Sequence, residues 1–379
     1  MGTFRRRLCV EGWRFIHHSY ALVNQWQLLT LLQRPDVALS THDVPLYGPH
    51  WRRSNGLFDD NEEAALAAIP DCDAQDQPDA IFKISFPFDL SLHPGTRKAV
   101  FGTAEVQTIP ESCFAGPIDL KRLRESDSFL VVTPSQWSRQ GFLRLGLRPE
   151  QVRVVPHGVQ ADIFTPRTRA LAKKEPGFVF AHASAMTNNK GTELLLRAFA
   201  AIASKHPDVR LLLKGIDGLY SSKETLAIAL GDLPAQSQHL IADRMSYSGE
   251  PFSVRQMADF YRSADAYVSP YRAEGFNLPV LEAAACGTPV ICTKGGPTDE
   301  FMRDDLALFI DSLITPVPNG RGSWLKPDLD HLIELMLRIM DDEPWRKNAA
   351  LAGPIHAAAN FNWSIVVDKL LNAIFVASR

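Results

Sequence analysis

Two carboxylates stand eight positions apart in a segment whose other residues indicate a strand-to-helix junction. The segment runs from Glu274 to Glu282, with Gly275 directly after the first acid and Pro279 shortly before the second. Pro279 suits the first turn of a helix, because its missing N–H would have no partner there. Glu282 then lies about one turn inside that helix, and its side chain leans back toward the loop that carries Glu274.

The backbone N–H groups between the two acids favour an anion. Gly275, Phe276 and Asn277 lie near the positive end of the expected helix dipole, which is a natural seat for a phosphate. A nucleotide-sugar fits this arrangement, because it is anionic in the middle and rich in hydroxyls at both ends. A structural alternative needs no ligand: Glu282 would stabilise a helix N-terminus, and Glu274 would be a surface acid.

The elements around this segment are those of a parallel-sheet domain. Residues 266–270 precede it as a buried strand, and 289–293 follow the helix as the next strand. Between them Gly287 is expected to cap the helix. The two acids therefore lie at the carboxyl end of a parallel strand, where α/β proteins bind their ligands.

Strand-like and helix-like segments alternate in two consecutive series. In the first half we expect strands at 8–10, 80–85, 98–102, 129–133 and 152–155, and helices at 19–32, 62–69 and 135–145. In the second half we expect strands at 178–181, 210–214, 246–248 and 265–270, and helices at 192–205, 254–263 and 362–375, the last after a broken stretch. The pattern predicts an α/β protein with two doubly wound Rossmann-like domains that face each other across a cleft.

Length supports two domains, because 379 residues are too many for one core. The polar, proline-containing segment 160–176 is the expected boundary. We therefore predict an N-terminal domain over residues 1–165 and a C-terminal domain over 166–360. A helix at about 361–379 is expected to pack back onto the N-terminal domain.

Composition excludes several classes of function. A net charge of −3 argues against a nucleic-acid partner. The N-terminus lacks the apolar core of a signal peptide, and no apolar run is long enough to span a membrane. Five cysteines without a Cys-x-x-Cys pair indicate reduced thiols in a cytoplasmic protein. The run Arg5-Arg6-Arg7 suggests a solvated basic face, or else peripheral contact with anionic lipid at the inner face of the membrane.

Three blocks together resemble the retaining glycosyltransferases of the GT-B architecture, specifically family 4 or glycosyl transferases group 1. They comprise 126–135 with 154–159, then 189–199, and finally 274–282 with 295–297. The resemblance covers about residues 127–375. The Glu-x7-Glu spacing alone is weak, but it becomes specific beside the helix start Lys190-Gly191 and the strand end His157-Gly158.

The resemblance implies a role for each matching position. Glu274 would contact hydroxyls of the donor sugar, Glu282 the ribose and Lys190 the diphosphate. A cation at a helix start also suits a phosphate on physical grounds. Further members of the implied donor site are Gly275, Phe276, Asn277, Leu278, Asn189 and Ser184.

The chain departs from the family pattern at two positions. An arginine usually stands five residues before the lysine, and here that position is Ala185. Lys214, which ends a strand on the same edge, is our candidate replacement, with a lysine snorkelling at a strand end as the alternative. A histidine usually follows the strand assigned to 98–102, and here the sequence reads Thr-Ala-Glu. Residues expected on the acceptor side are Glu105, His17 and Trp13.

Metal-ligand spacing is absent, so neither a metal nor another cofactor is expected. The adjacent His17 and His18 are better interpreted as loop or core histidines. Asp71-Cys72-Asp73 imitates the Asp-x-Asp of metal-dependent transferases. It lies in an acidic loop and does not follow an apolar strand, which favours a surface position.

The resemblance implies transfer of a sugar from a UDP- or GDP-sugar to a hydroxyl acceptor, with retention of anomeric configuration, in glycan, glycolipid or polysaccharide biosynthesis. The N-terminal domain would bind the acceptor, which would be a glycan, a lipid-linked sugar or a small molecule. A dinucleotide oxidoreductase is disfavoured because no Gly-x-Gly-x-x-Gly follows a strand. A sugar-nucleotide epimerase of the same architecture and a non-catalytic nucleotide-sugar-binding protein stay open as alternatives.

Overall fold

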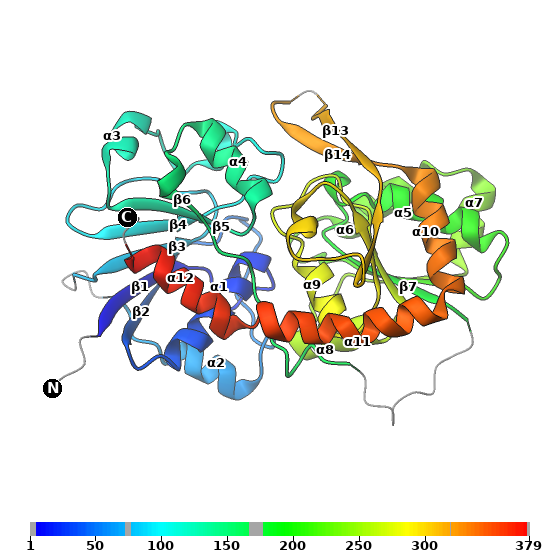
Figure 1. Ribbon diagram of the computed structural model, residues 1–379, viewed down its shortest axis with the longest axis horizontal. Coiled ribbons are helices and arrows are strands. Elements are labelled where there is room, and N and C mark those ends of the chain that lie inside the picture. Colours follow the sequence, from blue (N-terminus) through cyan, green and yellow to red (C-terminus); the bar gives the residue numbers. More distant parts are fainter. Residues whose placement is uncertain (1–4, 73–76, 167–176, 319, 377–379) are drawn as a thin grey trace. The chain divides into compact units, whose positions relative to one another are not determined.

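The chain forms two compact units in a computed structural model that describes residues 5–72, 77–166, 177–318 and 320–376 (Figure 1). Unit 1 comprises Met1–Gly158 and Trp363–Arg379, and unit 2 comprises Val159–Asn362. Most of the expected boundary segment, from residue 167 to 176, lies outside the described residues, as does Asp73.

Unit 1 contains a parallel six-stranded sheet in the order β2-β1-β3-β4-β5-β6. Its strands are β1 (Arg6–Gly12), β2 (Val37–Asp43), β3 (Ala80–Ile84), β4 (Arg97–Phe101), β5 (Phe129–Thr133) and β6 (Val152–Val154). The direction in which the strands are added reverses between β1 and β3. Ligands of open α/β sheets bind at the carboxyl ends of the strands beside such a point.

The helices of unit 1 are α1 (Ser19–Leu32), α2 (Asp60–Ala67), α3 (Leu120–Glu125), α4 (Gln136–Leu145) and α12 (Trp363–Phe375). Although α12 is the last helix of the chain, it lies beside α1 over the sheet of unit 1 (Figure 1). Its apolar stripe is fully buried and includes Val366, Val367 and Leu370. An ion pair between Arg34, two residues after α1, and Asp368 joins this segment to α12.

Unit 2 contains a second parallel sheet in the order β12-β11-β10-β7-β8-β9. Its strands are β7 (Val179–Ala183), β8 (Arg210–Lys214), β9 (Met245–Ser248), β10 (Ala266–Ser269), β11 (Val290–Thr293) and β12 (Ala307–Ile310). An antiparallel hairpin of β13 (Ser312–Pro316) and β14 (Ser323–Pro327) follows. The order reverses between β7 and β10, which places the switch point of this sheet there.

The helices of unit 2 are α5 (Thr192–Ala203), α6 (Ser222–Gly231), α7 (Ala235–Ala242), α8 (Val254–Arg262), α9 (Leu278–Ala285), α10 (Leu329–Asp341) and α11 (Glu343–Asn360). An apolar stripe of α5 is buried, including Leu195, Leu196 and Phe199, and it packs with Phe180 of β7 and Val268 of β10. The two parallel α/β sheets confirm the predicted fold class.

The segment before the last helix was predicted to be broken, and that prediction is wrong. Residues 343–360 form the continuous helix α11. Pro344 lies in its first turn, where a proline costs no hydrogen bond. Pro354 lies inside the helix and follows Gly353, so the usual rule that proline ends a helix fails there.

Gly353 allows α11 to approach the helix that carries Glu282. A Cβ atom on Gly353 would lie 2.4 Å from the carbonyl oxygen of Ala284 in α9. A backbone atom cannot move aside as the end of a flexible side chain can. The spacing of α9 and α11 therefore depends on the missing side chain.

We expect Gly353→Ala to lower the free energy of unfolding of unit 2 by about 1 to 3 kcal/mol, because the added methyl group overpacks this contact. Gly231→Ala is the matched control, since a Cβ atom there meets nothing within 4 Å. It should leave stability unchanged or raise it by up to about 1 kcal/mol. Calorimetric unfolding checks both variants, and a Gly353→Ala protein as stable as the wild type would contradict the packing argument.

Candidate active site

The junction after β10 has the local structure that the sequence predicts. Asn277 is the N-cap of α9 and has a φ of 78°, a left-handed conformation that asparagine tolerates better than most residues. Its side-chain Nδ2 donates to Ser269 Oγ at 2.9 Å, which ties the cap to the end of β10. Pro279 lies in the first turn, and Gly287 follows the helix with a φ of 73°. These details confirm the predicted strand-to-loop-to-helix order.

Asn189 joins the loop after β7 to the loop after β10. Its backbone oxygen accepts hydrogen bonds from the backbone N–H groups of Arg272 at 2.7 Å and Ala273 at 3.2 Å. Its side-chain Nδ2 donates to the carbonyl oxygen of Ala273 at 3.2 Å. These bonds hold together the two loops at the switch point of the sheet.

Lys190 and Glu274 are the next residues along the two joined loops, and they form an ion pair. Lys190 Nζ lies 2.9 Å from Glu274 Oε1, and the two side chains are 15% and 14% exposed. At this exposure both charges stay within reach of solvent, yet each is screened less than on an open surface. The structure thus brings together the cation and the first acid of the predicted site.

Gly191 makes this close approach sterically feasible. It has a φ of 70°, which favours glycine, and it precedes the first residue of α5. A Cβ atom at this position would lie 2.0 Å from the carbonyl oxygen of Pro270, directly after β10. A side chain here would therefore push the Lys190 loop away from β10.

Glu282, the second acid, is buried in α9, where it is 6% exposed. Its carboxylate accepts a hydrogen bond from the Tyr261 hydroxyl of α8 at 2.7 Å. Burial raises the pKa of Glu282 to about 7, and the tyrosine bond opposes that shift only in part. The negative charges of Glu274 and Glu282 both raise the pKa of the buried Tyr267 hydroxyl, after the larger effect of burial, so both acids lie near this ring.

Buried side chains hold the loop between the two acids in place. Phe276 is buried and stacks on Phe301, with ring centroids 4.4 Å apart and planes inclined by 18°. Leu278, the first residue of α9, is buried as well. These contacts fix the course of the backbone through Gly275, where the sequence predicts a phosphate seat.

Ser184 lies at the end of β7, within a chain of hydrogen bonds. His182 Nδ1 lies 2.8 Å from the carbonyl oxygen of Val268, so this nitrogen carries the proton. His182 Nε2 then accepts from Ser184 Oγ at 2.9 Å, and Ser184 Oγ accepts from the backbone N–H of Met186 at 3.0 Å. Burial lowers the pKa of His182 to about 4, which keeps the imidazole neutral.

Lys214 ends β8 beside β7, but it makes no ion pair with the described residues. The backbone N–H of Ser184 donates to its carbonyl oxygen at 3.0 Å. Its ammonium group donates to the carbonyl oxygen of Gly215 and lies 4.7 Å from the centroid of the Phe252 ring. Burial lowers the pKa of Lys214 to about 8, against the attraction of Asp217 and Glu250.

Arg272 and Tyr261 support the site, and the sequence interpretation missed both. Arg272 Nη1 donates to the carbonyl oxygen of Asn188 at 2.9 Å, and Nη2 pairs with Glu193 of α5. An arginine two positions before Glu274 was the available signal for this role. Tyr261 left no signal, because its contact with Glu282 spans 21 positions between two helices.

The three predicted acceptor-side residues lie in unit 1. Trp13 is 1% exposed, and its indole N–H donates to the carbonyl oxygen of Pro45 at 2.9 Å. His17 Nδ1 lies 3.2 Å from Ser54 Oγ. The backbone oxygen of Glu105 accepts from the Trp137 indole at 2.8 Å. The acceptor role of all three residues stays a prediction.

Two of the three N-terminal arginines make ion pairs, Arg6 with Asp36 and Arg7 with Asp79. In the part of the chain that the structure describes, every helix is too short or too polar to cross a membrane. Asp71 lies beside Thr41 in an isolated β-bridge and is exposed. The described residues contain no cluster of three or more His, Cys, Asp or Glu side chains suited to a metal ion.

Residues 177–342 match the family model described as Glycosyl transferases group 1. The matched range contains Lys190, Glu274 and Glu282, together with the residues that support them. The whole of this match lies within unit 2.

Curated relatives are similar over part of the chain. A D-inositol 3-phosphate glycosyltransferase of Nocardiopsis dassonvillei is 31% identical over 275 residues, which cover 69% of this chain and 58% of the relative. A GDP-mannose-dependent monoacylated alpha-(1-6)-phosphatidylinositol monomannoside mannosyltransferase of Corynebacterium glutamicum is 29% identical over 235 residues, which cover 58% of this chain and 55% of the relative. The chain thus spans about half the length of the curated relatives it matches.

Solved structures share the fold over nearly the whole chain. Sucrose-phosphate synthase from Thermosynechococcus elongatus superposes with a TM-score of 0.69 at 19% identity, covering 99% of this chain and 100% of that one. Anabaena HepE in complex with UDP and glucose superposes with a TM-score of 0.65 at 14% identity, covering 98% of this chain and 100% of that one. At these identities the likeness shows the fold alone, and it confirms the GT-B architecture.

The raised pKa of Glu282 predicts a stability that falls with rising pH. The carboxyl holds its proton to about pH 7 in the folded state but loses it near 4.5 when unfolded. The unfolded state therefore binds fewer protons between these values, and unfolding becomes easier as pH rises. We expect this group to lower the free energy of unfolding of unit 2 by about 2 to 3 kcal/mol from pH 5 to pH 8.

Glu282→Gln should remove this contribution, so that its unfolding free energy changes less over the same pH interval. Glu334→Gln, at an exposed position on α10, controls for the loss of one acid. Chemical denaturation at several pH values gives both quantities. Equal pH dependence in the wild type and Glu282→Gln would refute the assignment.

Proposed function

We propose that this chain, whose residues 177–342 match the Glycosyl transferases group 1 model, transfers a sugar from a nucleotide diphosphate donor to a hydroxyl acceptor. One observation carries the proposal: Lys190 and Glu274 meet at 2.9 Å on loops after β7 and β10. That is the switch point of the sheet, where open α/β domains bind ligands. The complex of Anabaena HepE with UDP and glucose, which has the same fold, supports a nucleotide-sugar donor.

Binding of the donor would give Lys190 and Glu274 new partners in place of each other. Before it binds, Lys190 and Glu274 neutralise each other. A diphosphate would take the place of Glu274 as the partner of Lys190, with the backbone N–H groups of Gly275, Phe276 and Asn277 as further donors. Glu274 would then accept hydrogen bonds from the sugar hydroxyls. We assign Glu282, at the far side of the loop, to the ribose.

Charge stabilisation of the leaving group would be the main catalytic effect. In the proposed step the bond from the anomeric carbon to the phosphate oxygen breaks, and a bond to the acceptor oxygen forms on the same face. The acceptor proton passes to the departing phosphate oxygen, and the anomeric configuration is retained. Lys190, the loop N–H groups and Lys214 would supply the positive charge, so we propose that no metal ion takes part.

We assign acceptor binding to unit 1 and propose a UDP- or GDP-sugar as donor. The name of the Corynebacterium relative specifies GDP-mannose and a phosphatidylinositol-based acceptor, and that of the Nocardiopsis relative specifies inositol 3-phosphate. Both names support a hydroxyl acceptor, on a lipid-linked glycan or a small molecule. A lipid-linked acceptor would place the protein at the cytoplasmic face of a membrane, in peripheral contact.

The first test is incubation with a panel of UDP- and GDP-sugars, with and without EDTA. We expect slow release of free UDP or GDP from at least one donor, unaffected by EDTA, because water can replace the acceptor. An epimerised donor would indicate an epimerase, and binding without turnover would indicate a non-catalytic binding protein. Either result would refute the proposed transfer.

Variants then connect the turnover to the site. Lys190→Ala should lower the release of nucleotide by about a hundredfold or more, because it removes a cation that faces the leaving group. Glu274→Gln should lower it as well. Lys205→Ala is the matched control, an exposed lysine just beyond the other end of α5. Full turnover by Lys190→Ala, with circular dichroism like that of the wild type, would remove the catalytic assignment.

Lys214 gives a separate prediction through its lowered pKa. Near pH 8 it is about half protonated in the free protein, and a nearby diphosphate would raise its pKa. UDP binding at pH 8 should therefore take up as much as about half a proton. Calorimetric titration in two buffers of different ionisation enthalpy measures this number.

Lys214→Met should abolish the proton uptake and weaken UDP binding, whereas Lys214→Arg should retain more of the affinity without the uptake. A wild type that binds UDP with no proton uptake, or a Lys214→Met variant that keeps it, would show that Lys214 does not replace the missing arginine at Ala185.

A further inference from the structure

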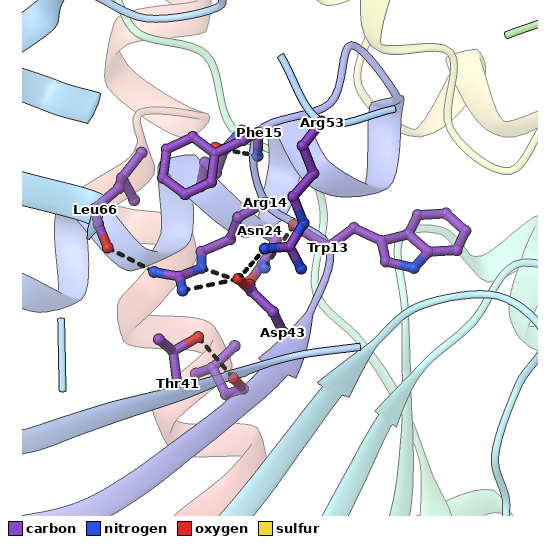
Figure 2. A network of polar contacts seen from close by, with 10 residues as sticks. Trp13, Arg14, Phe15, Asn24, Thr41, Asp43, Arg53 and Leu66 are labelled. Atoms are coloured by element: carbon purple, nitrogen blue, oxygen red, sulfur yellow. Dashed lines mark hydrogen bonds and ion pairs between the residues drawn. The ribbon is translucent and has the colours of Figure 1, made fainter. Parts of the chain in front are cut away.

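Three charged side chains meet at the carboxyl ends of β1 and β2 in unit 1 (Figure 2). Arg14 Nε lies 2.7 Å from Asp43 Oδ1, and its Nη2 lies 3.1 Å from Asp43 Oδ2. Arg53 Nη1 approaches the same Oδ2 at 2.7 Å. Two guanidinium groups thus share one carboxylate, and the cluster keeps one positive charge in excess.

Arg14 is the structural member of this cluster. Its side chain is 7% exposed, and its Nη1 donates to the carbonyl oxygen of Leu66 in α2 at 2.6 Å. A guanidinium buried to this degree needs a counterion, because an unpaired buried charge costs several kcal/mol. The bidentate contact with Asp43 supplies that counterion. The charge of Asp43 is thus already required by Arg14, and Arg53 is the surplus cation.

Arg53 directs unused hydrogen-bond donors to the solvent. Its side chain is 46% exposed and meets Asp43 through Nη1 only. None of the described residues accepts a hydrogen bond from its Nε or Nη2. The planar fork of an arginine matches the oxygens of a phosphate or carboxylate, and charge-assisted pairs of this kind are strong. Arg53 can therefore bind an oxyanion of a ligand through Nε and Nη2 while Nη1 stays paired with Asp43.

The backbone on both sides of Arg53 is held in place. The N–H of Ser54 donates to the carbonyl oxygen of Phe15 at 2.7 Å. On the other side Trp51 is 6% exposed, and its ring lies 5.5 Å from that of Trp13. Asp43 fixes one edge of the guanidinium. Ligand binding would therefore cost the protein little conformational entropy, which favours affinity.

We propose that the acceptor bound by unit 1 carries an oxyanion, a phosphate or a carboxylate, and that Arg53 recognises it. The inference rests on the proposed function, because it names the substrate class of the acceptor side. It is supported by the position of the cluster: Gly12 and Asp43 are register partners at the carboxyl ends of β1 and β2, next to the switch point of this sheet.

Arg52 provides a matched control within the same loop. It is exposed, as Arg53 is, and removing it changes the net charge equally. Its Nη1 donates to the carbonyl oxygens of Pro49 and Trp51, both at 2.8 Å, and not to Asp43. A specific site requires Arg53, whereas a general attraction of anions to a basic loop would depend on both arginines.

The experiment measures binding by the full chain with UDP or GDP, whichever of the two binds more tightly, at saturating concentration, so that the donor site is filled. The probes are matched pairs: glucose with glucose 6-phosphate, glucose with glucuronate, and myo-inositol with myo-inositol 1-phosphate. Vesicles of phosphatidylcholine with and without phosphatidylinositol test the same oxyanion on a lipid. Binding is compared among the wild type, Arg53→Gln, Arg53→Lys and Arg52→Gln.

We expect the wild type to bind the anionic member of at least one pair about tenfold to a hundredfold more tightly than the neutral member. Arg53→Gln should reduce that preference to less than about threefold, Arg53→Lys should restore part of it, and Arg52→Gln should keep it. Preference among the soluble pairs would identify a free acceptor, and preference only among vesicles would identify a lipid headgroup.

The inference is overturned if no anionic probe is preferred by the wild type. It is overturned equally if Arg53→Gln keeps the preference, or if both arginine variants lose it to the same degree. The affinities for UDP and GDP are measured first in the wild type, because they report on the proposed donor site of unit 2. A wild type that binds neither UDP nor GDP would count against the proposed function, whereas nucleotide binding without anion preference would overturn only this inference.

Discussion

The hydrogen bonds of Asn189 to residues 272 and 273 are the contact on which the candidate site depends. They join the loop after β7 to the loop after β10, which are neighbours in the sheet but far apart in the sequence. Because Lys190 and Glu274 come next in these two loops, the hydrogen bonds of Asn189 bring these two side chains together. Gly191 contributes by its lack of a side chain, since any Cβ atom would strike Pro270. The hydrogen bonds between the two loops thus position the charged side chains of the candidate site.

The two acids of unit 2 lie in different environments, and this separates their chemistry. Glu274 has a cationic partner and remains partly open to solvent, so it can exchange that partner for a ligand. Glu282 is buried in α9, and burial raises its pKa to about 7, although the hydrogen bond from Tyr261 opposes that shift. Unit 1 shows the same division, with Arg14 enclosed and Arg53 exposed on one carboxylate. In both units a buried charged group lies beside a more exposed one, and the more exposed one is the group for which we propose a ligand.

Local structure could be predicted from the sequence, and long-range contacts could not. Asn277, Pro279 and Gly287 each have a conformational preference that acts within a few residues, so the junction around α9 was predictable in detail. The hydrogen bond from Tyr261 to Glu282 joins two helices, and no periodicity or motif in the sequence predicts it. The helix over 343–360 was missed because Pro354 normally ends a helix, while here tertiary packing against α9 overrides that preference. The excess charge at Arg53 was hidden as well, since it depends on Asp43 already serving Arg14.

The return of α12 to unit 1 has a consequence for the order in which the protein can fold during synthesis. Unit 2 is continuous in sequence, from residue 159 to residue 362, and its closing β-bridge between Val159 and Asn362 lies at its own two ends. Unit 1 is interrupted, because the helix that covers its sheet is translated after all of unit 2. Most of unit 1 therefore emerges from the ribosome before unit 2, yet unit 1 is completed after it. Until α12 emerges, the apolar surface under that helix stays uncovered, which is the kind of nascent surface that chaperones bind.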